Sequence, residues 1–113
     1  MGLDFVGSEA SWSYSSFGNF RRRLAKEIGI DLDNMVGFGG KIKWNNIKDP
    51  IKDLLNHSDC DGHLTPTQCK KIAPRLIELV SKWEDIDFDK EAALLLAKGM
   101  TECAKAKKNL EFV

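Results

Sequence analysis

The chain has 113 residues, of which 42% are hydrophobic and 30% are charged. This length suits one domain with its own core, and the composition excludes both a disordered chain and a membrane-spanning one. Seventeen basic residues balance seventeen acidic ones, so the formal net charge is zero. A general electrostatic attraction to nucleic acid or to an anionic membrane is therefore not favoured.

Three cysteines, Cys60, Cys69 and Cys103, form an odd set. The first residues of the sequence contain neither a basic stretch nor an apolar run of the length that export signals have. Free thiols are typical of reducing compartments. We therefore expect a cytoplasmic protein.

The first part of the sequence predicts one extended segment and one amphipathic helix. Leu3 and Phe5 flank a polar residue, which favours an extended segment at about 2–6. Ser13 or Ser15 can cap a helix that runs to about residue 29. Its apolar residues recur every three or four positions and therefore share one face. They are Phe17, Phe20, Leu24 and Ile28.

The middle of the sequence is the least regular part. Asp31 can cap one helical turn, and a glycine-rich run follows that ends any helix. The alternation in residues 41–44 predicts a short strand. Asp49 and Pro50 then signal the start of a short helix over about 50–57.

The clearest local signal is a capping box formed by Thr65 and Gln68, with Pro66 at the first helical position. The apolar periodicity of this helix continues to about Trp83. Pro74 lies inside it, removes one backbone donor and clashes with the preceding turn. We therefore expect a kink or a break at Pro74.

The last helix is expected over about 88–108, beginning at Asp87 or Asp89, with a wide apolar surface. The alternation in residues 110–113 predicts a strand that pairs with residues 2–6. An isolated pair of strands is marginal, so this pair would rest on the helices.

These elements predict a mainly α fold for the whole chain, 1–113. We expect a single-domain bundle of four or five helices, with a short two-strand pairing of the N- and C-terminal segments. An EF-hand-like helix-loop-helix would occupy about 50–83.

The loop between the two helices of that unit contains Asp59, Asp61 and Gly62. With these residues, the segment 57–68 resembles the calcium loop of an EF-hand, in which alternating oxygen ligands precede a glycine at a sharp turn. The resemblance implies that Asp59 and Asp61 are Ca²⁺ ligands. The first position is a histidine and the twelfth a glutamine, where the family has Asp and a bidentate Glu. We therefore expect a turn without metal, in which the carboxylates of Asp59 and Asp61 accept hydrogen bonds from nearby backbone groups.

The same segment also contains nitrogen and sulfur ligands: His57, Cys60 and His63, followed by Cys69. Two imidazoles and two thiols are a ligand set that zinc accepts in a closed tetrahedral site. Cys69, however, falls on the apolar face of a predicted helix, where a cysteine ordinarily acts as a small buried hydrophobic residue. A zinc site of His57, Cys60 and His63 is therefore the second metal hypothesis.

No pattern in the sequence predicts catalysis. Cys60 with His57 and His63 has the residue types of a nucleophile and its base, but no group supplies an oxyanion partner. The consecutive Arg21, Arg22 and Arg23 would point in directions spread over about 200° of a helix. A solvated helix face is therefore their expected role, with nucleic-acid contact as the alternative.

Four segments together suggest a relationship: Gly2–Phe5, Trp12–Phe17, Leu54–Gly62 and Leu110–Phe112. With them the chain resembles a group of small bacterial and phage-borne proteins. The resemblance implies a prokaryotic or viral protein and transfers no functional residue.

The sequence therefore predicts a small non-enzymatic accessory protein that binds a protein partner and needs no cofactor. This preference depends on the lack of a nucleophile–base pair, a phosphate loop or a full metal shell. A Ca²⁺- or Zn²⁺-binding helix-loop-helix module and a nucleic-acid-contacting regulator are the two alternatives.

Overall fold

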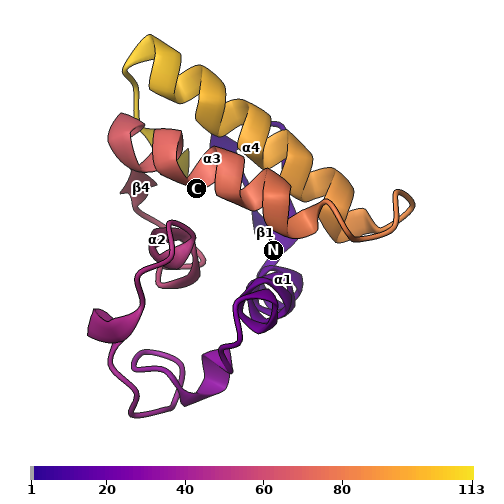
Figure 1. Cartoon of the computed structure of the whole chain (residues 1–113). Helices are drawn as coiled ribbons and strands as arrows, with labels where there is room; N and C mark the ends of the chain where they lie inside the picture. The colour runs from indigo at the N-terminus through magenta and orange to yellow at the C-terminus, as the bar shows by residue number, and fades with distance from the viewer. Residues whose placement is uncertain (1) are drawn as a thin grey trace.

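The computed structural model describes residues 2–113 and contains four α-helices and five short strands within them (Figure 1). The helices are α1 (Tyr14–Glu27), α2 (Lys52–Leu55), α3 (Pro66–Val80) and α4 (Phe88–Ala106). The strands are β1 (Gly2–Leu3), β2 (Phe5–Val6), β3 (Trp12–Ser13), β4 (His63–Leu64) and β5 (Leu110–Phe112). Two 3-10 turns, η1 (Leu32–Asn34) and η2 (Trp44–Asn46), lie between α1 and α2.

The helices form two layers. The long helices α3 and α4 lie side by side as a hairpin, and α1 and α2 lie beneath it, seen nearly end-on in Figure 1. Each long helix begins where the sequence predicts. Thr65 and Gln68 form the reciprocal capping box of α3, and Asp87 accepts hydrogen bonds from two backbone N–H groups at the start of α4.

The strands form two antiparallel sheets. β1 pairs with β3, and β5 lies between β2 and β4. The predicted pairing of the two terminal segments is confirmed, with Phe5 opposite Phe112. Asp4 and Val113 exchange two further backbone hydrogen bonds of 3.1 and 3.0 Å.

The prediction of a mainly α bundle is therefore wrong, because the fold is a mixed α/β fold. The inner strands β3 and β4 have only two residues each, too few for a visible alternation pattern. Their pairing depends on distant segments, which local propensity does not report. The segment expected to be an EF-hand-like unit, at about 50–83, contains α2, β4 and α3, and β4 in its loop pairs with β5.

Three smaller expectations also change. No break occurs at Pro74, because α3 is continuous from Pro66 to Val80 with Pro74 on its exposed side. Residues 41–44 do not form a strand of their own. Ile42 makes one isolated bridge to Met35, and Trp44 begins η2. The helix expected over 50–57 is the single turn α2.

Aromatic rings join both sheets to α1. Trp12 stacks on Phe20 with ring centroids 4.7 Å apart, and Phe5 packs edge-on against Phe112 at 4.9 Å. Phe17 lies between these pairs and is fully buried. One contiguous cluster of buried side chains extends from this group into α3 and α4. Among residues 2–113, no helix has both the length and the apolar character that a membrane span needs.

The segment after β2 packs directly on α4 at Gly99. The Ser8 hydroxyl donates a 2.9 Å hydrogen bond to the Leu95 carbonyl oxygen. A Cβ atom at position 99 would overlap the Gly7 carbonyl oxygen and the Ser8 side chain. Gly99 is therefore required by this close contact between the segment and the helix.

We predict opposite effects for two glycine-to-alanine substitutions in helices. Gly99→Ala should destabilise the protein by about 1–3 kcal/mol, because the new methyl group overpacks a backbone contact. Gly18→Ala should stabilise it by about 0.5–1 kcal/mol, because only a flexible Arg22 side chain lies near the new methyl group. Urea unfolding of the three proteins measures both changes. A stabilising Gly99→Ala would contradict the packing described here.

Candidate functional site

The loop between α2 and α3 turns sharply and then joins the three-stranded sheet. The Ser58 hydroxyl accepts hydrogen bonds from the N–H groups of Cys60 and Asp61, at 3.2 and 3.4 Å. Gly62 has φ = +90°, as the predicted sharp turn requires. Within residues 2–113, the carboxylates of Asp59 and Asp61 do not accept the expected hydrogen bonds from backbone groups. The Ser58 hydroxyl stabilises the turn instead.

His57 is held through both nitrogens of its ring. Nδ1 lies 2.9 Å from the Ser58 carbonyl oxygen, and Nε2 lies 3.0 Å from the His63 carbonyl oxygen. The ring stacks on Phe112 with centroids 3.8 Å apart. A metal ion needs the lone pair of a ring nitrogen, and here both nitrogens face carbonyl oxygens. His57 therefore ties the loop to β5, and metal binding would have to break one of these contacts.

The other proposed metal ligands do not converge. Asp59 is half-buried, Cys60, Asp61 and His63 are exposed, and Cys69 is fully buried. Gln68, at the twelfth loop position, is occupied by the capping box of α3. Over residues 2–113, no three His, Cys, Asp or Glu side chains are placed to share a metal ion. The structure thus brings the metal-like residue types into one loop without forming a coordination shell.

The three cysteines should react at very different rates. Cys60 is exposed, whereas Cys69 and Cys103 are buried. Burial raises the pKa of Cys69 to about 11 and also raises the pKa of Cys103, so both remain protonated near neutral pH. With Ellman's reagent we expect one rapidly reacting thiol in the native protein and the other two only after denaturation. Cys60→Ser should abolish the rapid phase, and a rapid phase that persists would contradict this assignment.

A cleft of about 550 Å³ opens beside the same loop, and His57 is part of its lining. Its walls come from α1, from the turn that carries Phe38, and from the loop after α2. The lining contains charged and polar side chains as well as aromatic ones. They include Tyr14, Asn19, Arg21, Phe38, Ser58 and Asp59.

Arg21 is the one buried charged side chain in residues 2–113, with 4% of its surface exposed. Its guanidinium carbon lies 4.7 Å from the ring centroid of Phe17 and 5.0 Å from that of Phe38. Nη1 donates to the carbonyl oxygens of Leu55 (3.2 Å) and His57. Burial lowers the pKa of Arg21, and nearby charges modify it less. Arg21 therefore holds the end of α2 against α1.

The neighbouring arginines point elsewhere. Arg22 pairs with Asp33 at 3.0 Å on the surface, and Arg23 pairs with Asp87 and Asp89 at the start of α4. The three side chains thus belong to three different environments, and each of the two surface arginines has an acidic partner. They do not form one cationic surface of the kind that nucleic acid requires.

Periodicity could have identified Arg21 as a buried residue. It lies four residues after Phe17 and three before Leu24, on the same apolar face of the helix. A run of three arginines instead suggested a solvated face, because solvent exposure is the usual state of such side chains. The position within the periodic pattern was therefore a better signal than the residue type.

The turn between α3 and α4 is held by a network around Arg23. The guanidinium donates hydrogen bonds of 3.0 and 2.7 Å to Asp87 and 2.8 Å to Asp89, and it lies 3.8 Å from the Trp83 ring centroid. Lys90 Nζ donates to the Trp83 carbonyl oxygen at 2.8 Å. Both ends of the turn are thus fixed to neighbouring elements.

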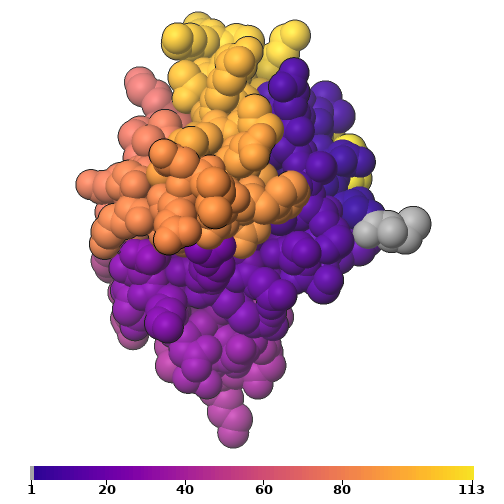
Figure 2. All heavy atoms as spheres, turned by 90° about the vertical axis from the view of Figure 1, so that its right-hand side faces the viewer, coloured from indigo at the N-terminus to yellow at the C-terminus, as the bar shows by residue number. Residues whose placement is uncertain are grey.

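Two large apolar side chains project from this fixed turn. Ile86 is 91% exposed and Phe88 is 65% exposed. The remaining exposed large apolar residues in 2–113 have between 41% and 59% of their surface exposed. They are Val6, Val36, Ile42, Ile77, Leu94 and Val113. Figure 2 looks onto this end of the hairpin, where the turn lies at the surface and faces the viewer.

Acid should weaken the fold through two arginine–carboxylate pairs. Hydrogen bonds from Arg75 and Arg23 lower the pKa of Asp49 and Asp87. These carboxylates bind protons more weakly in the folded state, so their stabilisation is complete above the unfolded pKa of about 4 and is lost as pH falls through the folded values. At pH values below about 4, we expect the free energy of unfolding to decrease.

Asp49→Asn should make that pH dependence shallower, whereas Asp61→Asn should leave it unchanged, because Asp61 is exposed and has no ion pair within residues 2–113. Urea unfolding at several pH values measures both. If Asp49→Asn and Asp61→Asn changed the pH dependence of the free energy of unfolding equally, the Asp49–Arg75 pair would not be its cause.

No protein-family model, curated protein or solved structure matches this chain.

Proposed function

We propose that this chain is a small non-enzymatic accessory protein that acts by binding a protein partner through the α3–α4 turn. The observation that carries this proposal is the exposure of Ile86 and Phe88, at 91% and 65%. Both side chains are large and apolar, and water in contact with them can be displaced by a partner with a favourable change in free energy.

Ile86 and Phe88 are exposed although the backbone that carries them is held by hydrogen bonds. Asp87, which lies between the two side chains, accepts hydrogen bonds from Arg23 and from the first N–H groups of α4. Ile86 and Phe88 are therefore presented from a backbone that is already ordered. An ordered binding segment loses less conformational entropy when it associates than a flexible one does.

The charges around the two side chains indicate the chemistry of the partner. Glu84 and Asp85 are exposed neighbours of Ile86 in the turn, and Asp85 has only Lys90 as an ion-pair partner within residues 2–113. Lys90 and the exposed Lys82 offset these two charges, so the turn favours a partner with an apolar pocket and no strong charge of either sign. We infer that the partner is a different protein and not a second copy of this chain.

Two features support a cytoplasmic setting for this partner. Cys60, Cys69 and Cys103 are all free thiols, which fits a reducing compartment. The resemblance to small bacterial and phage-borne proteins points to the same setting.

A photocrosslinking experiment tests the proposal. Phe88→p-benzoylphenylalanine should give a covalent adduct with one protein in cells of the native host. The additional substitution Ile86→Ser should remove most of that adduct, because it removes the neighbouring apolar contact. Mass spectrometry identifies the adduct and the site of attachment.

Ile42→p-benzoylphenylalanine is the matched control, because Ile42 is also a well-exposed apolar residue, at 52%, but lies in another segment. It should not give the same adduct. Identical adducts from positions 42 and 88, or crosslinks only between copies of this chain, would contradict the proposed partner surface.

A further inference from the structure

The guanidinium of Arg21 lies in a nearly dry position without a carboxylate at ion-pair distance among residues 2–113. A buried charge is costly unless it is paired and hydrogen-bonded. Leu55 and His57 supply two carbonyl oxygens, which satisfy part of its hydrogen-bonding capacity but leave the charge without a counterion. The structure around Arg21 is thus electrostatically incomplete.

The unsatisfied part of the guanidinium is one particular edge. Nη1 is occupied by the two carbonyl oxygens, whereas Nε is buried and has no hydrogen-bond partner among the described residues. No hydrogen bond from Nη2 is formed within that part of the chain either. Nε and Nη2 together are the edge of an arginine that can hold a carboxylate with two parallel hydrogen bonds.

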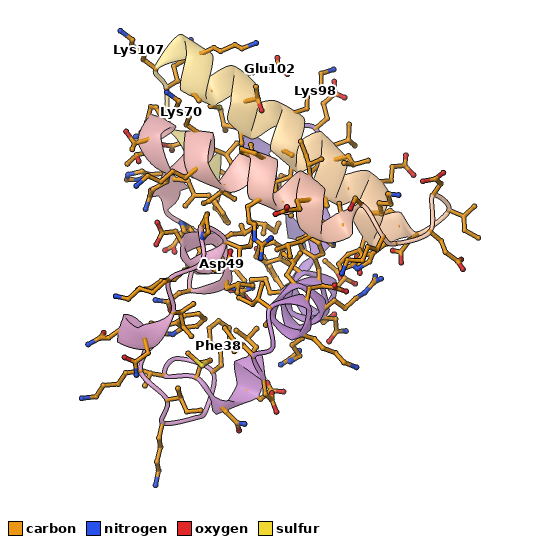
Figure 3. All side chains as sticks on the ribbon, in the orientation of Figure 1. Phe38, Asp49, Lys70, Lys98, Glu102 and Lys107 are labelled. Carbon is orange, nitrogen blue, oxygen red and sulfur yellow. The ribbon has the colours of Figure 1, made fainter. Side chains whose placement is uncertain are left out.

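This edge belongs to a side chain that lines the cleft of about 550 Å³. Tyr14, Asn19 and Ser58 contribute hydroxyl and amide groups to the same walls, which can hydrogen-bond the rest of a small polar ligand. Phe38 lies in the loop beneath α1 (Figure 3), between Gly37 and Gly39, which both have positive φ, and its ring packs on the guanidinium of Arg21. Because Nε is buried, a ligand reaches the free edge only when the side chains that cover it move.

Asp59 weakens the binding of any anion in this cleft. Its carboxylate lines the same cleft and attracts Arg21 without forming an ion pair with it. It therefore offsets only part of the charge of Arg21, and Arg22 is already paired with Asp33. An anion at the Nε–Nη2 edge keeps a net attraction to Arg21, which the negative charge of Asp59 reduces.

We propose that this cleft binds a small molecule through a carboxylate group, which occupies the Nε–Nη2 edge of Arg21. The site is separate from the α3–α4 turn, so it does not depend on the proposed function. The ligand would complete the charge balance around a side chain that joins α1, α2 and the loop after α2.

The test follows the arginine Nε–Hε resonances of the full chain by NMR while sodium acetate is added at constant ionic strength. We expect the Arg21 resonance to shift saturably, with half-saturation at about millimolar acetate. Sodium chloride should not shift it.

Two charge variants that retain Arg21 provide the controls. Asp59→Asn should lower the half-saturating acetate concentration about three- to tenfold, because it removes the competing negative charge. Glu84→Gln should change it by less than about twofold, because Glu84 is exposed in the α3–α4 turn, outside the cleft.

Two results would overturn the proposal. They are the lack of a saturable shift of Arg21 at about 100 mM acetate, and a larger effect from Glu84→Gln than from Asp59→Asn. Neither of these readouts requires a variant in which Arg21 itself is replaced.

Discussion

The position of β5 between β2 and β4 is the constraint on which the rest of this structure depends. Leu110 and Phe112 of β5 are buried, and Phe112 contacts both Phe5 and the ring of His57. His57 in turn offers its carbonyl oxygen to Arg21. The sheet therefore fixes the loop after α2, and the loop fixes one wall of the cleft. A short strand organises a polar site through a single histidine.

The sequence predicted the helix starts and the pairing of the two terminal segments. The capping box of Thr65 and Gln68 and the cap at Asp87 depend on side chains within three positions of the helix start, and alternating apolar residues indicated the terminal strands. The strands β3 and β4 could not be predicted in this way, because two residues carry no periodicity and their pairing depends on other segments. The error in fold class follows directly from this difference.

The same distinction between local patterns and contacts with distant segments applies to the candidate sites. Residue types in the loop 57–68 suggested metal ligands, but the contacts of His57 and Ser58 use that loop to turn the chain and join it to β5. The burial of Arg21 depends on Phe38 and on the carbonyl oxygens of α2 and the following loop, which arrive from distant segments. Consecutive arginines thus acquire separate roles only when the tertiary structure forms.

The local contacts of the α3–α4 hairpin and the long-range contacts of the three-stranded sheet imply an order of assembly. The α3–α4 hairpin needs closure of only a short turn, so its entropic cost is small and it can form early. The three-stranded sheet needs segments from both ends of the chain and from the middle to meet, which makes it a late event in refolding. We therefore expect the hairpin to supply the folding nucleus, and the polar cleft to be assembled last.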